Sequence, residues 1–575
     1  MSSPNGPLSI GIDYGTLSGR VLVLDLLTGA ELAGVDVPYD HGAIEETLPG
    51  SDERLGSDWS LQHPLDYVDV IERGIPAALA QAGADPARVI GLGVDFTSCT
   101  VLPATADGTP LCLQAEWRAR PHAWPKLWKH HAAQPQADRL TELAQERDEA
   151  FLERYGGRIS SEWYFPKLLQ IYEQDREIYE AAAKFIEATD WIVWHLTGVE
   201  RRCSCAASYK AFWSPDAGLP AAEFFDAAAA GFSGSLERLG TDFHPLGSCA
   251  GTVRPDLAER LGLPADVAVA VGNVDSFVSV PGAGVERPGT LVTVIGTSIC
   301  DMVVHHDAIL VPGITGVVRD GILPGLYGYE AGQPAVGDML GWYVGNLLGG
   351  DRGESYDALE AAAGELAPGA TGLVALNWWN GNRSILADAD LSGVIAGLTL
   401  STTAAEIYRA LLESVAFAAR RIIDNFVDHG LTIDQLVACG GIAEKSPVLM
   451  QLLADITGRP VQVPSSRQIP ARGAAMFGAV AAGTNGTQRG GFRDIADAVK
   501  RLRPEIARSY TPDAAATQAH DRVYEIYRGL HDTLGAQHVE WLHGLKHLRR
   551  VAFAGAGEVP ATAPVGRVAE HRSRA

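Results

Sequence analysis

Two distant segments of the chain share one layout, in which a turn with Gly-Thr and a nearby serine separates two apolar runs. The first, IGIDYGTLSGRVLVL, begins at Ile10, and the second, VTVIGTSICDMVV, begins at Val292. Alternating apolar residues on both sides of a glycine turn predict two antiparallel strands in each segment. A duplicated strand–loop–strand unit, one in each of two domains, is the economical interpretation. Chance repetition of a short pattern is the alternative.

The length of 575 residues is too great for one hydrophobic core and predicts about two or three domains. Between the hairpins the sequence predicts a strand at 89–94 and a largely helical region at about 121–200, before the turn-rich PGAGVERPG at 281–289. A helix is predicted at 402–429, capped by Ser401 or Thr402, and then strand, Gly-Gly turn, helix and strand at 431–463. This alternation predicts an α/β protein. We expect domains at 1–285 and 286–551, and a disordered Ala/Gly/Pro-rich tail at 552–575.

Composition excludes several classes of protein. The net charge of −24 argues against a nucleic-acid partner, because binding to a phosphate backbone requires a basic surface. No apolar stretch reaches the roughly 18 residues that a membrane-spanning helix needs, and the N-terminus does not resemble a secretory signal. Seven scattered cysteines do not suggest a disulfide framework. We therefore expect a cytoplasmic protein with free thiols, without membrane association or a nucleic-acid ligand.

Two common nucleotide-binding motifs are absent from the sequence. It contains no G-x-x-x-x-G-K-[ST], and Gly91-Leu92-Gly93 does not continue as G-x-G-x-x-G. The Gly-Thr turns nevertheless offer backbone N–H groups and hydroxyls to a phosphate, and Asp13 before the first turn suits Mg²⁺. Two such turns on facing domains would clamp a nucleotide, with the Gly440-Gly441 turn against its base or sugar. Plain hairpins that bind nothing are the alternative.

The two turns, the Gly440-Gly441 segment and the stretch Gly393–Glu413 together resemble the FGGY carbohydrate kinases. Leu411, and Gln170 within SEWYFPKLLQIYE, depart from the residues common at those positions. The resemblance implies two ribonuclease-H-like α/β domains of the actin/hexokinase type that flank a cleft, and it implies ATP and Mg²⁺. It also implies that Asp13 holds the metal and that ATP is bound by Gly15, Thr16, Ser18, Arg20, Gly296, Thr297, Ser298, Gly440, Gly441 and Lys445.

Longer strings are most similar to the branch of this family that phosphorylates L-ribulose at its 5-hydroxyl. They include GVDFTSCT, RYGGRISSEWYFPK, YEAGQPAVGDMLGW and NWWNGNRSILADADLSG. The likeness implies formation of L-ribulose 5-phosphate, a step of L-arabinose catabolism, with a small sugar and ATP as partners; a homodimer is the one assembly considered. A kinase for another pentulose or a pentitol (D-ribulose, ribitol or L-xylulose) is the near alternative. A non-catalytic or chaperone-like ATPase of the same superfamily is the alternative from a different class.

Asp275, in VGNVDSF, is the predicted general base. Transfer of a phosphoryl group to a sugar hydroxyl needs a carboxylate within hydrogen-bond reach of that hydroxyl. Asp275 also follows an apolar run and a Gly-Asn turn, which places it at the end of a strand. A turn aspartate that caps the next helix is the alternative.

Further residues are assigned to the sugar by analogy with the family. Glu330 would accept hydrogen bonds from sugar hydroxyls, as would Asp95 or the backbone near Ser98. Lys210 would donate to the sugar, with a surface lysine as the alternative. Trp128 would form an apolar wall of the pocket, with a core tryptophan as the alternative. The NWWNGNR loop, residues 377–383, is unusual in composition and is assigned no role.

Overall fold

Two seven-stranded sheets organise the chain. The computed structural model describes residues 6–555, apart from 53, 57, 350–351 and 487–488. In the first sheet, the antiparallel strands β1 (Leu8–Tyr14), β2 (Ser18–Asp25) and β3 (Glu31–Pro38) adjoin β4 (Val89–Phe96), which runs parallel to β1. Beyond β4 lie the short strands β10 (Ala268–Ala270), β9 (Cys249–Thr252) and β11 (Asn273–Val274).

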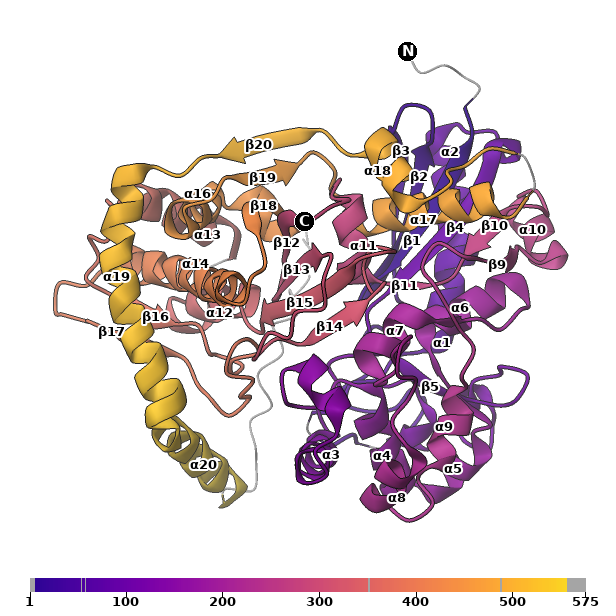
Figure 1. Ribbon diagram of the computed structural model, residues 1–575, viewed down its shortest axis with the longest axis horizontal. Helices are drawn as coiled ribbons and strands as arrows, with labels where there is room; N and C mark the ends of the chain where they lie inside the picture. The colour runs from indigo at the N-terminus through magenta and orange to yellow at the C-terminus, as the bar shows by residue number, and fades with distance from the viewer. Residues whose placement is uncertain (1–5, 53, 57, 350–351, 487–488, 556–575) are drawn as a thin grey trace, which may run out of the picture.

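The second sheet follows the same plan. Strands β12 (Gly289–Ile295), β13 (Ile299–His305), β15 (Tyr327–Gln333) and β14 (Gly316–Arg319) are antiparallel neighbours. Strands β18 (Ile433–Cys439) and β19 (Val461–Pro464) continue the sheet parallel to β12, and β20 (Ile506–Tyr510) closes its edge. Figure 1 shows the two sheets side by side. The predicted two-domain α/β fold, with one hairpin unit in each sheet, is confirmed.

Helix α17 (Ile469–Thr484) comes late in the sequence but packs on the first sheet (Figure 1). Strand glycines let its backbone approach. A Cβ atom on Gly11 would lie 1.8 Å from the carbonyl oxygen of Ala471, and one on Gly93 would lie 1.9 Å from that of Ala474. Gly91-Leu92-Gly93 therefore serves close helix packing within β4.

The core of the first sheet thus draws on both sides of the boundary predicted at 285/286. Helix α18 (Ile495–Leu502) joins α17 in this core. The boundary itself falls between α11 (Asp275–Gly282) and β12. Below, "first half" means residues 6–285 and "second half" residues 286–555.

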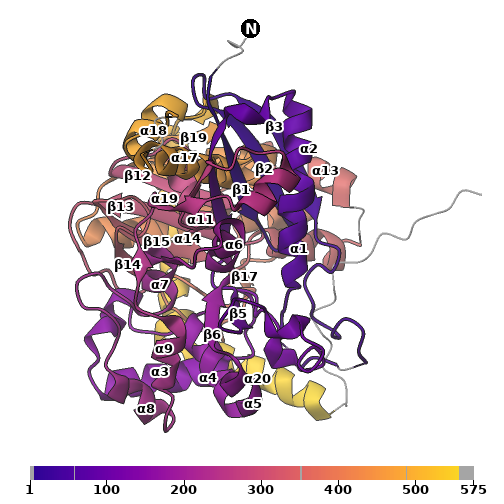
Figure 2. The same cartoon turned by 90° about the vertical axis from the view of Figure 1, so that its right-hand side faces the viewer.

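Helices fill the part of the first half outside its sheet. Around the two-stranded antiparallel sheet of β5 (Val101–Ala104) and β6 (Lys184–Glu187), Figures 1 and 2 place a group of short helices that enclose a separate apolar core. This group comprises α3 (Gln134–Glu146), α4 (Tyr164–Gln174), α5 (Arg176–Ala181), α8 (Ala222–Ala228) and α9 (Gly234–Leu239).

The long helix of the second half, α14 (Ala404–Asp428), has a different cap from the two that were predicted. Thr403 is the N-cap: its hydroxyl accepts the N–H of Glu406 at 3.3 Å, and the Glu406 carboxylate accepts the N–H of Thr403 at 2.7 Å. This reciprocal box requires a glutamate three residues after the cap. Only Thr403 meets that spacing, so Ser401 and Thr402 stay outside the helix.

Other elements complete the two halves. They are α1 (Pro64–Asp69), α2 (Ile75–Ala82), α6 (Ala188–Thr197), α7 (Ser204–Lys210), β7 (Arg202–Cys203), β8 (Phe243–His244), α10 (Pro255–Leu261), α12 (Gly337–Trp342), α13 (Arg352–Gly364), β16 (Val374–Leu376), β17 (Val394–Ala396), α15 (Gly441–Lys445), α16 (Pro447–Thr457), α19 (Ala514–Asp532) and α20 (Val539–Gly555).

The predicted tail at 552–575 lies outside the described residues from 556 onward, and residues 552–555 belong to α20. All seven cysteines are described and are free thiols. Within the described chain, no helix combines the length and apolar character needed to cross a membrane.

Candidate active site

Acidic side chains gather where the central strands of the first sheet end. Pairing of β1 with β4 sets Asp13 beside Asp95, and pairing of β4 with β11 sets Asp95 beside Asn273. Asp275 follows two residues later as the first residue of α11. Because these strands run parallel, their carboxyl ends meet at one edge of the sheet. Three carboxylates that are far apart in the sequence are thereby brought together.

Asp95 is the most buried of the three carboxylates. Its side chain is fully enclosed, and no donor among the described residues reaches either carboxylate oxygen, although the Asp13 carboxylate is close enough to accept a hydrogen bond from Asp95 when Asp95 is protonated. Burial raises the pKa of Asp95 well above its usual value, and the charges of Asp13 and Asp275 raise it further. A buried carboxylate without a partner is costly, so this position favours a ligand that supplies hydrogen-bond donors or positive charge.

Asp275 has the electrostatics of a general base near neutral pH. Burial raises its pKa to about 7, the charge of Asp13 acts in the same direction, and Lys210 opposes it. Its Oδ1 accepts the N–H of Ser276 at 2.7 Å. The N-cap of α11 is Val274, so Asp275 lies inside the helix and does not occupy the capping position.

Lys210 and Glu330 form a buried ion pair between the two halves. Lys210 ends α7, which packs against β11 and β14, and Glu330 lies on β15. Lys210 Nζ is 3.1 Å from Glu330 Oε2, and the two side chains are 7% and 9% exposed. Burial tends to lower the pKa of Lys210, but the carboxylates of Glu330 and Glu162 outweigh it and the pKa is raised. The surface-lysine alternative is therefore excluded.

Each Gly-Thr hairpin is closed by a hydrogen bond from the N–H of its glycine to the carbonyl of its serine, although the first turn is one residue longer than the second. Gly15 N–H donates to the Ser18 carbonyl at 3.0 Å, and Gly296 N–H donates to the Ser298 carbonyl at 2.9 Å. Thr16 lies between the first pair, and Thr297 is exposed between the second. These contacts close both turns and leave their remaining polar groups at the ends of β1 and β12.

Arg20 and Trp128 brace the first hairpin. Arg20 Nη1 lies 2.9 Å from Asp13 Oδ2. Trp128 is half-buried, and its indole N–H donates to Thr16 Oγ1 at 3.1 Å. The structure thus places Trp128 on the predicted phosphate turn. Ser98, beyond β4, has an enclosed Oγ without a hydrogen-bond partner in the described chain.

The Gly440-Gly441 turn adjoins the second hairpin. Pairing of β12 with β18 aligns Val294 with Cys439, and Gly440 follows at φ 95°. A Cβ atom there would lie 2.5 Å from the Ile295 carbonyl oxygen, so glycine is required by both backbone conformation and space. Helix α15 then ends at the exposed Lys445. The predicted ATP-binding residues of the second half therefore form one neighbourhood.

A second ion pair between the two halves was not predicted. Arg383 Nη2 lies 3.4 Å from Glu162 Oε1, and Arg383 acts electrostatically on Cys300. The NWWNGNR loop was noted for its composition, but nothing in the sequence indicated that its last residue faces residue 162. Such a pairing between the halves depends on tertiary packing.

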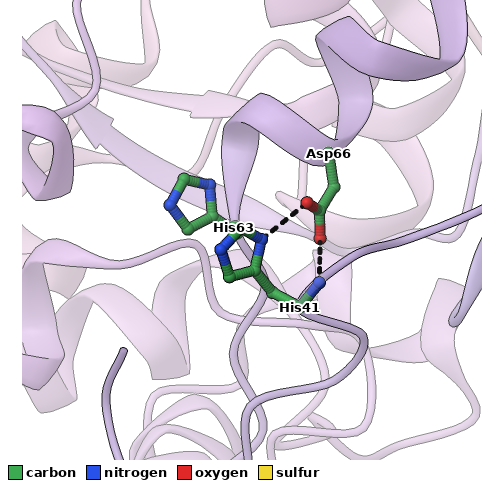
Figure 3. A group of neighbouring side chains, drawn as sticks. All are labelled: His41, His63 and Asp66. Carbon is green, nitrogen blue, oxygen red and sulfur yellow. Dashed lines mark hydrogen bonds and ion pairs between the residues drawn. The ribbon is translucent and has the colours of Figure 1, made fainter. Parts of the chain in front are cut away.

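A possible metal-ligand group lies elsewhere, on the loop after β3 and at the start of α1. It consists of His41, His63 and Asp66 (Figure 3), the one such group of three among the described residues. The two rings are stacked, with centroids 4.0 Å apart and planes 14° apart. Nearly parallel rings share no in-plane position within bonding distance of both. His41 Nδ1 is also 2.7 Å from Asp66 Oδ1, and His63 Nδ1 accepts the N–H of Leu65. This arrangement does not fit a metal ion.

Known proteins resemble the chain over most of its length. The model of the FGGY family of carbohydrate kinases, C-terminal domain, matches residues 291–482. A protein of Anoxybacillus flavithermus named ribulokinase is 47% identical over 554 residues, 95% of this chain and 98% of that protein. One of the same name from Mycolicibacterium smegmatis is 45% identical over 546 residues, 93% of this chain and 95% of that protein. The crystal structure of xylulose kinase from Rhodospirillum rubrum has a TM-score of 0.75 at 26% identity, covering 93% of this chain and 100% of that one.

Proposed function

The chain belongs to the FGGY family of carbohydrate kinases, and from this we propose that it transfers the γ-phosphoryl group of ATP to the 5-hydroxyl of L-ribulose. The products would be L-ribulose 5-phosphate and ADP. The observation that carries the choice of sugar is the near-complete length over which relatives named ribulokinase are 45–47% identical to it.

We assign the role of general base to Asp275. Its pKa of about 7 lets it accept the proton of the sugar hydroxyl at neutral pH, as that oxygen attacks the γ-phosphorus atom. The ADP oxygen leaves on the opposite side of the phosphoryl group. A carboxylate with the ordinary, lower pKa of aspartate would be a weaker base. The raised pKa of Asp275 therefore supports this role.

The groups around Asp275 suit a polyol. Lys210 supplies donors, Glu330 supplies acceptors, and their mutual ion pair fixes both side chains. Asp95 and Ser98 offer polar atoms that lack partners in the described chain. These atoms would be satisfied by sugar hydroxyls or ordered water. We assign all four residues to sugar binding.

ATP would lie between the two hairpin turns. Gly15, Thr16, Ser18 and Arg20 would contact its phosphates from the first half, and Gly296, Thr297 and Ser298 from the second, with Gly440, Gly441 and Lys445 beside the adenosine. The acidic edge of the first sheet fits a cation, because Asp95 is a buried carboxylate without a partner next to Asp13. Asp13 would hold Mg²⁺, which when bound neutralises phosphate charge.

The test is a coupled ADP-release assay with ATP and Mg²⁺ on L-ribulose, D-ribulose, L-xylulose and ribitol. The highest kcat/KM should be with L-ribulose, and mass spectrometry of the product should locate phosphate on C5. A clear preference for another pentulose or a pentitol would transfer the proposal to that sugar. Failure to phosphorylate any of them would overturn it. Sedimentation of the same preparation would decide whether the expected cytoplasmic enzyme is a homodimer.

A further inference from the structure

Two side chains from separate segments hold the carbonyl groups of the first Gly-Thr turn. The hydroxyl of Tyr39, which follows β3, donates to the carbonyl of Gly15 at 3.0 Å. The amide nitrogen of Gln62, just before α1, donates to the carbonyl of Thr16 at 2.8 Å. Both donor side chains are buried, so these carbonyls face the interior of the first half.

The Gln62 side chain has one orientation that satisfies its contacts. It is fully enclosed, and its Oε1 accepts the hydroxyl of Tyr67 at 2.8 Å. A backbone carbonyl can only accept a hydrogen bond, so the nitrogen of the amide must face Thr16 and the oxygen must face Tyr67. The ring of Tyr67 also packs edge-on against that of Tyr39, with centroids 6.0 Å apart. The two contacts to the turn therefore share one buried support.

The direction of each carbonyl fixes the direction of the N–H group that follows it. A trans peptide unit is planar and places these two groups on opposite sides of the chain. Because the carbonyls of Gly15 and Thr16 are held inward, the N–H groups of Thr16 and Leu17 point away from the support. Neither N–H donates to another group within the described chain, and the Leu17 side chain is 60% exposed. Two successive N–H groups in a turn form a concavity that binds anions.

We propose that Tyr39 and Gln62 are positioning residues that orient the first Gly-Thr turn, so that the N–H groups of Thr16 and Leu17 face the phosphates of ATP. The inference rests on the proposed function, since it concerns the nucleotide of that same reaction. Each side chain acts by holding one carbonyl away from the nucleotide, not by touching it. A carbonyl released from its support is free to rotate toward the phosphates, where its partial negative charge repels them and its N–H partner is withdrawn.

The test measures by calorimetry the dissociation constants of a non-hydrolysable ATP analogue with Mg²⁺ and of L-ribulose. Tyr39→Phe removes only the hydroxyl, and Gln62→Met keeps the length of the side chain without a donor. Each should raise the dissociation constant of the analogue by about tenfold, the size of one hydrogen bond, and leave that of the sugar unchanged. Tyr67→Phe should act in the same direction, because it frees the amide of Gln62. The double variant Gln62→Met/Tyr67→Phe should bind the analogue no more weakly than Gln62→Met alone, since Tyr67 acts through Gln62.

Tyr14→Phe is the matched control. It removes a buried hydroxyl from the same cluster of tyrosine rings, but that hydroxyl donates to the backbone carbonyl of Tyr67 at 2.9 Å and not to the turn. Both dissociation constants should stay as in wild type. If Tyr39→Phe and Gln62→Met bind the analogue as wild type does, weaken analogue and sugar alike, or act no more strongly than Tyr14→Phe, the inference is overturned and these side chains only stabilise the fold. Should Gln62→Met fail to fold, Tyr39→Phe, which removes a single oxygen atom, decides by the same criteria. Wild-type turnover on the sugar panel and wild-type binding of the analogue are recorded first, so a failure of the proposed function is seen separately.

Discussion

The ammonium group of Lys210 lies 3.1 Å from the carboxylate of Glu330, although the two residues belong to different halves of the molecule. One ends a helix that packs on β11, and the other lies on the second sheet. Both side chains are almost fully enclosed. Removal of one partner from such a pair leaves the other charge buried and uncompensated, whereas removal of both is far less costly. The pair therefore allows its structural and functional roles to be separated.

Lys210→Met should be both unstable and poorly active. We expect a loss of about 3 kcal/mol in the free energy of unfolding, because Glu330 is left without its partner. Sugar phosphorylation should fall by roughly a hundredfold in kcat/KM, since a charged donor to the sugar is lost. Urea unfolding and the coupled assay provide the two numbers.

The double variant Lys210→Met/Glu330→Gln is the control for this prediction. Stability should return toward wild type, because no unpaired charge remains, while kcat/KM for the sugar stays low. Recovery of activity along with stability would show that Lys210 matters only for folding.

Asp275→Asn should abolish sugar phosphorylation while nucleotide still binds. An amide cannot accept the hydroxyl proton, and loss of a general base costs about 10²–10⁴ in rate. Calorimetric titration with a non-hydrolysable ATP analogue should give a dissociation constant close to that of wild type. Undiminished sugar-dependent ADP release would contradict the proposed base and favour a non-catalytic ATPase.

The activity should have an acidic limb near pH 7. Asp275, with a pKa of about 7, works as a base only when deprotonated, so kcat/KM for the sugar should rise with pH through that value and then level. Among the charged groups near Asp275, Asp13 and Glu330 raise its pKa and Lys210 lowers it, and Asp95 interacts with it as a further buried carboxyl group. Glu330→Gln should therefore move the limb to lower pH.

Asp301→Asn is the matched control for the pH profile. Asp301 is also buried, and its pKa is about 7. Because Asp301 follows Cys300 directly along β13, its side chain points to the face of the second sheet opposite to that of Cys300. Its replacement should leave the limb in place. Loss of the limb in this variant would show that Asp275 is not the titrating group.

The sequence predicted the two hairpins well because the pattern that forms a hairpin lies within a few consecutive residues. The hairpin at residues 10–24 and its counterpart from Val292 both form where glycine turns separate alternating apolar residues. The cap of α14 was predicted one or two residues early, since Ser401, Thr402 and Thr403 are all good caps and only the glutamate at 406 selects among them.

Contacts between distant segments could not be predicted in the same way. The sequence around Lys210 and Arg383 does not distinguish these residues from surface residues. Each is buried beside a carboxylate only because the two halves pack together. The sequence of Gly91-Leu92-Gly93 excluded a dinucleotide motif but did not indicate that these glycines admit the close approach of helix α17, which comes almost 400 residues later. Only the fold brings these pairs together.

Gly93→Ala should therefore destabilise the protein strongly. The added Cβ would lie 1.9 Å from the Ala474 carbonyl oxygen, so β4 and α17 must separate. We expect a loss of about 3 kcal/mol, the upper end of overpacking effects, measured by urea unfolding. Gly529→Ala in α19 has no atom within 4 Å of the new Cβ and should gain about 0.5–1 kcal/mol from helix propensity. Equal effects in the two variants would contradict the packing argument.

Asp95→Asn should stabilise the free protein at high pH and not at low pH. Burial raises the pKa of Asp95, so the folded state binds this proton more tightly than the unfolded state does. Stability must then fall as pH rises from the unfolded pKa, about 3.9, through the folded pKa. The amide removes that loss, and we expect a gain of about 1 kcal/mol or more at pH 8 that vanishes near pH 4. Thermal melts across this range measure it.

Asp36→Asn provides the comparison for Asp95→Asn. Asp36 lies 3.4 Å from Arg20, the same arginine that pairs with Asp13, but its side chain is 64% exposed, so its replacement should change stability little at any pH. If Asp95 is the buried acceptor for Mg²⁺-ATP and sugar, its variant should in addition gain less thermal stability from those ligands than wild type does. An Asp95→Asn protein less stable than wild type at every pH would mean that the carboxylate already has a partner that stabilises its charge.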